Sequence, residues 1–181
     1  MSATSANRYH PLARALHWLL GLAIVSNFAL GIYMHELPFS PARLQYYSWH
    51  KWAGVLILVF SAVRLLTRLV SSPPALPQAI ESAMPGWQKR AHQATHLGLY
   101  LLFFLVPLSG WAFSSASGFP VVVFGVLPLP DFVPVSESLA EILKEVHKFA
   151  ALGMAALVLL HVAGALKHHF IDRDGLLGRM T

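Results

Sequence analysis

Residues 146–161 read VHKFAALGMAALVLLH, a mostly apolar run with His147 near its start and His161 at its end. The two histidines are fourteen positions apart, a separation that turns a helix back to within roughly 40° of its starting direction and spans about 21 Å. Both imidazoles therefore project from one face of one helix, near its opposite ends. Ligating or ionisable side chains inside a membrane are energetically expensive and usually functional. The spacing predicts two stacked cofactors.

The composition is that of a membrane protein. The 181 residues are 56% hydrophobic and 12% charged, with a mean hydropathy of +0.57, which is too apolar for a soluble domain. The absence of cysteine excludes disulfides, cysteine-ligated iron–sulfur clusters and thioether-attached haem, and ten histidines make imidazole the leading metal ligand. The net charge of +5 is scattered around predicted helix ends, which favours a topological role over nucleic-acid binding.

The hydropathy pattern predicts an all-α fold, a bundle of four transmembrane helices that forms a single domain over residues 1–181. The predicted spans are about 17–34, 49–70, 92–113 and 146–166. The first span is too long for a signal peptide and lacks a following cleavage site. We interpret residues 35–48 as a short loop, residues 71–90 as a proline-rich linker, and residues 114–143 as a loop lying at the membrane interface. Pro107 is expected to kink the third span.

The basic residues predict the orientation. Four spans put both termini on one side of the membrane. That side carries nine basic residues: Arg8, Arg14, Arg64, Arg68, Lys89, Arg90, Lys167, Arg173 and Arg179. The opposite side carries Arg43, Lys51, Lys144 and Lys148. This bias predicts cytoplasmic termini.

Topology then decides which histidines meet. His17 and His161 fall at one depth, and His50 and His147 at another, roughly 20 Å away. Two facing imidazoles without carboxylates suit the iron of a low-spin b-type haem better than zinc. Ligation by two imidazoles leaves no open iron position, which favours electron transfer. The alternative is that these histidines only hydrogen-bond between helices.

Other residues near these depths are candidates for supporting roles. Gly21, Gly54 and Gly164 are small enough to let a porphyrin approach the helices. Candidate partners for haem propionates are Arg14, Arg64 and Arg68 on the cytoplasmic side, and Lys51 and Lys148 on the other.

The remaining histidines leave several interpretations open. His92 and His96 are one helical turn apart and have four possible roles. They could hold a metal, compete with His17 as ligands of the inner haem, contact haem propionates or border a quinone pocket. His168 and His169 are either interfacial residues or a quinone site that bonds a carbonyl or carries its proton. His10 and His35 are expected to be surface residues.

Four motifs in order resemble the prokaryotic cytochrome b561 family. They are RALHWL in the first span, HKWAG with VRLLTRL in the second, AHQATHLGLYLLF in the third, and VHKFAALGMAALVLLHVAGALKHHF in the fourth. The resemblance covers nearly the whole chain and implies a small inner-membrane cytochrome with two non-covalent b haems. It assigns ligation to His17, His50, His147 and His161. It also implies ubiquinone near His168 and His169, with superoxide oxidation in some relatives.

The resulting hypothesis is an oxidoreductase of the superoxide:quinone type in the bacterial inner membrane. Electrons pass from a periplasmic one-electron donor or redox partner to ubiquinone on the cytoplasmic side, with His168, His169 and His96 as quinone-site candidates. Arg43, Lys51, Lys144 and Lys148 would attract an anionic donor such as superoxide, although Glu137, Glu141 and Glu145 partly cancel their field. The alternatives are a membrane anchor that relays electrons for a dehydrogenase or hydrogenase, and a histidine-box di-metal oxygenase.

Overall fold

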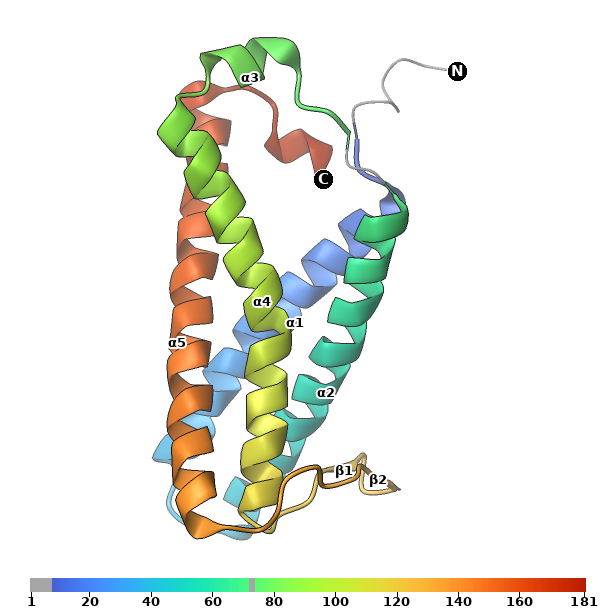
Figure 1. The fold of residues 1–181 in the computed structure, drawn as a ribbon, viewed down its shortest axis with the longest axis vertical. Helices are drawn as coiled ribbons and strands as arrows, with labels where there is room; N and C mark the ends of the chain where they lie inside the picture. The colour runs from blue at the N-terminus through green and yellow to red at the C-terminus, as the bar shows by residue number, and fades with distance from the viewer. Residues whose placement is uncertain (1–7, 72–73) are drawn as a thin grey trace.

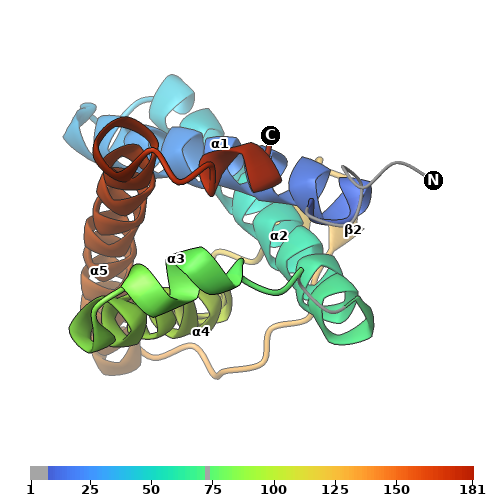
Figure 2. The ribbon, with the colours of Figure 1, turned by 90° about the horizontal axis from the view of Figure 1, so that it is seen from above.

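Four long helices form a bundle in the computed structural model, which describes residues 8–71 and 74–181 (Figure 1). They are α1 (Pro11–Glu36), α2 (Pro41–Val70), α4 (Gly86–Ala116) and α5 (Glu137–Lys167). Each is long and apolar enough to cross a membrane. Four helices of spanning length, as predicted, are thereby confirmed, and α1 packs mainly against α2 while α4 packs mainly against α5 (Figure 2).

The helices extend beyond the apolar runs that marked them in the sequence. Pro11 and Pro41 occupy first positions, where a missing backbone N–H costs nothing. The Ser40 hydroxyl accepts a hydrogen bond from Arg43 N (3.2 Å), and the Ser136 hydroxyl accepts one from Leu139 N (3.4 Å). Helix α2 therefore begins at Pro41, and the loop predicted over residues 35–48 shrinks to residues 37–40. Hydropathy marks the lipid-facing part of a helix and not its polar ends.

The start of α1 and the C-terminus lie at one end of the bundle, as an even number of spans requires (Figure 1). Tyr9 N donates to Arg179 O (3.2 Å), and Trp18 Nε1 donates to Met180 O (2.8 Å). The same end carries α3 (Gln78–Ala83) inside the predicted linker, a π-helical turn (His168–Asp172) that continues α5, and a short 3₁₀ helix (Leu177–Arg179). We call it the terminal end; its cytoplasmic location stays a prediction from the charge bias.

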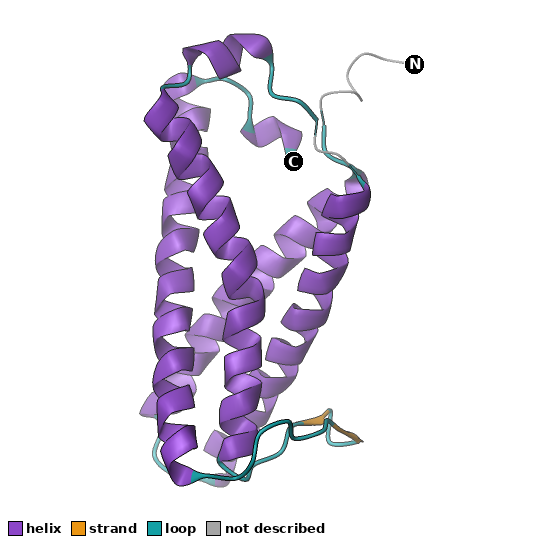
Figure 3. Cartoon of the chain, viewed as in Figure 1, coloured by secondary structure: helices purple, strands orange, loops and turns teal. Residues whose placement is uncertain are grey.

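The opposite end carries a two-stranded hairpin where an irregular loop was predicted (Figure 3). Strand β1 (Val122–Val123) pairs antiparallel with β2 (Leu127–Pro128). Two neighbouring residues of α2 bind this segment: Trp52 Nε1 donates to Val122 O (2.6 Å), and Lys51 Nζ donates to Phe119 O (3.2 Å), just before β1. Lys51 Nζ also donates to Ser114 Oγ at the end of α4 (3.2 Å). The hairpin is therefore attached to the bundle, and we call this the hairpin end.

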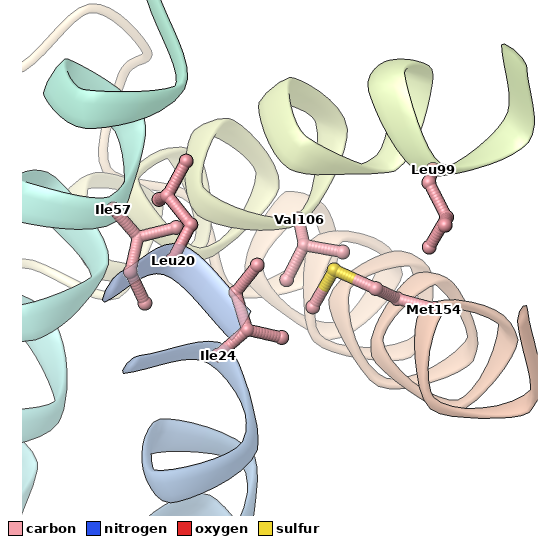
Figure 4. Packing of buried hydrophobic residues seen from close by; sticks show 6 residues of the cluster. All are labelled: Leu20, Ile24, Ile57, Leu99, Val106 and Met154. Atoms are coloured by element: carbon pink, nitrogen blue, oxygen red, sulfur yellow. The ribbon is translucent and has the colours of Figure 1, made fainter. Parts of the chain in front are cut away.

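An apolar layer fills the middle of the bundle (Figure 4). Its buried members come from all four long helices and are Leu20, Ile24, Ile57, Leu99, Val106 and Met154. Met154 lies seven residues from His147 and seven from His161, on the same helical face as both. The layer therefore separates the two histidine levels of α5.

Candidate functional site

The structure brings together both predicted histidine pairs. At the terminal end, the rings of His17 on α1 and His161 on α5 have centroids 5.9 Å apart and planes at 73°. At the hairpin end, the rings of His50 on α2 and His147 on α5 have centroids 6.1 Å apart and planes at 89°. We call these the terminal pair and the hairpin pair. Helix α5 supplies one member of each pair because its two histidines share a face.

Backbone carbonyls orient both rings of the hairpin pair. His50 Nδ1 lies 3.2 Å from Asn27 O on α1, and His147 Nδ1 lies 2.9 Å from Val106 O on α4. A carbonyl oxygen only accepts, so each Nδ1 carries the proton and each Nε2 keeps its lone pair for another partner. Metal-bound histidines commonly show this arrangement. The Asn27 side chain adds a second link, because its Nδ2 donates to His50 O (3.3 Å).

A glycine lies four residues after each of these carbonyls and leaves room for the ring. A Cβ at Gly31 would lie 3.1 Å from His50 Cε1, and a Cβ at Gly110 would lie 2.8 Å from His147 Cε1. Sequence reasoning missed both glycines, although each lies at the depth of its histidine. At Gly21, Gly54 and Gly164 a Cβ would meet no other described atom within 4 Å, so there is open space beside these helices.

Side chains surround the terminal pair. Arg64 Nη2 lies 3.2 Å from His17 Nδ1, while Arg64 Nη1 donates to Ala13 O (3.0 Å). His96 contacts the other member, with its ring centroid 5.1 Å from that of His161. The environment of this pair is therefore cationic and rich in imidazole.

The two ambiguous histidines of α4 are connected to each other. The rings of His92 and His96 lie 4.2 Å apart, and His96 Nδ1 donates to His92 O (2.8 Å). His96 is thus held next to His161, and His92 lies one turn closer to the terminal end. Their arrangement extends the terminal pair along α4.

The histidines that follow α5 differ in their surroundings. His168 Nδ1 lies 2.5 Å from Asp174 Oδ2 and 3.1 Å from Asp172 Oδ2, and its Nε2 lies 3.2 Å from Gln88 Nε2 on α4. His169 is exposed, with its ring 4.7 Å from that of Phe170. Sequence reasoning missed both aspartates and Gln88, because their approach to His168 depends on the π-helical turn.

The four predicted donor-side cations are engaged to different degrees. Lys51 is held by the hairpin segment, and Lys148 forms an ion pair with Glu145 (3.3 Å). The Arg43 guanidinium lies over the Tyr47 ring at 5.6 Å. Lys144 is exposed. The exposed cations at this end are therefore Lys144 and the partly neutralised Lys148.

The residues of both pairs fit a metal held by two imidazoles. Metal–nitrogen bonds of about 2 Å on either side are compatible with ring centroids about 6 Å apart. Among the described residues, no Asp or Glu forms a hydrogen bond or ion pair with the four histidines. One turn before His17, the Arg14 Nε atom is buried without a hydrogen-bond partner in the described chain. A haem propionate would supply that partner.

Comparisons with known proteins identify the family of the chain. Residues 8–181 match the family described as prokaryotic cytochrome b561. Cytochrome b561 homolog 2 of Escherichia coli K12 is 35% identical, with 99% of this chain and 95% of the relative aligned. Cytochrome b561 homolog 1 of the same organism is 30% identical, with 96% and 97% aligned. A protein of Yersinia pestis named probable superoxide oxidase CybB is 29% identical, with 96% and 95% aligned.

Proposed function

Because the chain belongs to the prokaryotic cytochrome b561 family, we propose that it carries electrons between a one-electron donor at its hairpin end and ubiquinone at its terminal end. Family membership and the four apolar helices identify a multi-pass protein of the bacterial inner membrane that binds b-type haem and transports electrons. Beyond this, we propose the number of haems, the residues that ligate them and the two substrates.

The observation that carries the proposal is the presence of two facing imidazole pairs at different depths, with ring centroids 5.9 Å and 6.1 Å apart. We propose that His17 and His161 hold one b-type haem and that His50 and His147 hold the other. A haem iron with two imidazole ligands supplies a one-electron couple and no site for oxygen binding. Two such groups in one membrane protein suit electron transfer across the bilayer.

The chain's own residues prepare these sites. The carbonyls of Asn27 and Val106 fix the tautomers of the hairpin pair, so that both Nε2 atoms are available without rearrangement. Arg64 and Arg14 supply positive charge beside the terminal pair, where propionates need partners. The apolar layer around Met154 excludes water between the two levels.

The donor proposal depends on charge and on one relative. The Yersinia pestis relative is named a probable superoxide oxidase, and we propose superoxide as the donor of this chain too. Lys144 and Lys148 at the hairpin end would raise the local concentration of an anion. Reduction of quinone at the other end consumes two electrons and two protons, and His96, His168 and His169 are the candidate quinone-site imidazoles near that end.

The decisive experiment counts the haems of the purified protein. A pyridine haemochrome assay is expected to give two b haems per chain. The single variants His147→Ala and His161→Ala are each expected to lose one haem, and the double variant both. A colourless wild-type protein, or a double variant with its full haem content, would refute the ligand assignment.

The substrates need a separate assay. Purified protein in liposomes is expected to reduce ubiquinone when superoxide is generated, and the rate should fall with ionic strength. Replacement of Lys144 and Lys148 by Gln should weaken that salt dependence. The matched control is Lys89→Gln at the terminal end. No quinone reduction by wild-type protein would eliminate superoxide as the donor, and a salt-independent rate would eliminate the electrostatic role.

A further inference from the structure

The two helix pairs of the bundle separate toward the terminal end. Helix α1 packs mainly against α2 and α4 mainly against α5, while α1 has few contacts with α5. At the hairpin end α2 and α4 converge, and Lys51 of α2 donates to Ser114 of α4 (Figure 1). At the terminal end, the start of α1 and the end of α2 lie on one side, and the start of α4 and the end of α5 lie on the other (Figure 2). The terminal pair joins these two sides, because His17 belongs to α1 and His161 to α5.

One segment of the chain crosses from the second side to the first. Residues 173–181 leave the end of α5 and run to α1, and we call them the C-terminal strap (Figure 2). Two residues with positive φ, Arg173 (51°) and Gly175 (76°), turn the chain away from the axis of α5. The start of the strap is fixed to α5, since Asp174 Oδ2 lies 2.5 Å from His168 Nδ1. The short 3₁₀ helix Leu177–Arg179 then carries the strap to its contacts with the other side.

Arg179 attaches the strap to the side of α1 and α2. Although it is charged, this residue is only 6% exposed. Its Nη2 donates to the backbone carbonyls of Pro74 (2.7 Å) and Ala75 (2.8 Å), which follow α2. The guanidinium also lies over the ring of Tyr9, just before α1, at 5.8 Å. Opening the strap would break all of these contacts, and a buried charge that loses its hydrogen bonds is costly.

The backbone of the strap binds α1 beside the terminal pair. The Arg179 carbonyl accepts a hydrogen bond from Tyr9 N (3.2 Å), and the Met180 carbonyl accepts one from Trp18 Nε1 (2.8 Å). Trp18 directly follows His17, and the centroids of their rings lie 5.4 Å apart. The strap therefore begins on the helix that carries one candidate ligand and ends on the turn that carries the other.

From these contacts we propose that the C-terminal strap retains the haem of the terminal pair, and that Arg179 keeps the strap closed. The proposal rests on the proposed function, which assigns a haem to this pair. A group held between α1 and α5 leaves when the two sides of the bundle part at this end, and parting them breaks the bonds of the strap. The hairpin pair lies at the opposite end, where α2 and α4 converge, so the strap does not retain a haem there. Arg179 acts through the strap and is a positioning residue.

The test measures the transfer of haem from the purified protein to excess apomyoglobin, followed by absorbance. Two backgrounds separate the sites: His147→Ala is expected to hold only the haem of the terminal pair, and His161→Ala only that of the hairpin pair. In the first background we expect Arg179→Ala to accelerate haem loss about tenfold or more, because two hydrogen bonds of a buried charge are lost. In the second background we expect an unchanged rate.

Two further variants at arginine positions sharpen this test. Arg179→Lys keeps the charge but lacks the planar guanidinium that binds two carbonyls and lies over a ring, so we expect an intermediate rate. The matched control is Arg90→Ala, which removes an exposed arginine from α4 at the same end. It should change the rate in neither background.

A milder variant decides the question if Arg179→Ala does not fold. Trp18→Phe keeps an aromatic ring beside His17 but removes the N–H that donates to the Met180 carbonyl. We expect it to accelerate loss of the haem of the terminal pair by about threefold. Its matched control is Trp87→Phe, which changes an exposed tryptophan of α4 at the same end.

The possible results separate the two proposals. Equal rates for each variant and its control would overturn the role of the strap. Equal acceleration in both backgrounds would also overturn it, since that result indicates a general loss of stability. A wild-type protein that binds no haem at the terminal pair would instead overturn the proposed function, and the role of the strap would fall with it.

Discussion

The hairpin pair and the terminal pair place the same two side chains on opposing helices, yet different groups stand behind the rings. At the hairpin pair these groups are mainly backbone: the carbonyls of Asn27 and Val106, and two glycines without side chains, with one small neutral side chain, the Ser109 hydroxyl, 3.3 Å from His147 Nδ1. At the terminal pair they are the side chains of Arg64 and His96. Backbone groups in contact with a ring hold it in one geometry and one tautomer. Side chains in this position add charge and groups that exchange protons, which the quinone reduction proposed for this end would require.

The largest effect is expected at Gly110, where the hairpin pair has no spare room. In Gly110→Ala the new Cβ would lie 2.8 Å from His147 Cε1 and 3.0 Å from Nδ1, so the ring must move. We expect loss of the haem at the hairpin pair and retention of the other, which a haemochrome assay would show as one haem per chain.

The control for Gly110 is Gly153→Ala on α5. A Cβ there meets no described atom within 4 Å, so we expect both haems and slightly higher stability. Equal haem contents in the two variants would contradict the tight packing of the His147 ring against Gly110.

A smaller effect is expected at Gly31, on the other side of the same pair. The added Cβ of Gly31→Ala would lie 3.1 Å from His50 Cε1, a contact that a displacement of a few tenths of an ångström relieves. We expect both haems to bind, with an altered low-temperature EPR signal for one, because the ring is rotated or tilted. A spectrum identical to that of the wild type would show that the His50 ring is packed less tightly against Gly31 than the His147 ring is against Gly110.

The reduction potential of a haem at the terminal pair should depend on the nearby charge. Arg64→Met removes a guanidinium 3.2 Å from His17 Nδ1. Positive charge stabilises the reduced state of a nearby redox group, so we expect one reduction potential to fall on the order of 50 mV, about 1 kcal/mol for one electron. Spectroelectrochemistry measures it.

The comparison for Arg64 is Arg68→Met, one turn further along α2 and exposed. It should change the potential less, because solvent screens its charge. Equal shifts in both variants, or a shift of both haems in Arg64→Met, would remove the contrast between the pairs.

The smallest effect is expected at Asn27. Asn27→Ala removes the bond from Nδ2 to His50 O (3.3 Å) but keeps the backbone carbonyl that accepts from His50 Nδ1. A loss of stability of about 1 kcal/mol is expected, with haem content unchanged. Thermal unfolding followed by haem absorbance would show it. Loss of a haem in this variant would mean that the Asn27 side chain, and not its backbone carbonyl, holds the His50 ring in place.

Sequence reasoning predicted the parts of this molecule that depend on helical periodicity and hydropathy. Four spans and the meeting of His17 with His161 and of His50 with His147 follow from depth alone. The polar helix starts at Pro41 and Glu137 were missed, because hydropathy does not report on helix beyond the membrane. The hairpin was missed for a different reason: its strands have two residues each and depend on side chains of α2.

The groups that hold the imidazole rings in place were the least predictable feature. A carbonyl has no signature in the sequence, and only packing distinguishes Gly31 and Gly110 from Gly21, Gly54 and Gly164. The approach of Asp174 to His168 depends on a single left-handed residue, Arg173, that no sequence pattern indicated. Such contacts arise from tertiary structure and require coordinates.

His50, Lys51 and Trp52 are consecutive residues of α2; Trp52 binds the hairpin at Val122 O, and Lys51 binds Phe119 O and Pro120 O just before it. The candidate ligand and the attachment of the hairpin segment therefore belong to one helical turn. Local unfolding of that turn would release both together, so the hairpin end should behave as one cooperative unit in hydrogen exchange. The amide protons of the β1–β2 hairpin would then lose protection in step with those of α2 around His50, well before the middle of the bundle opens.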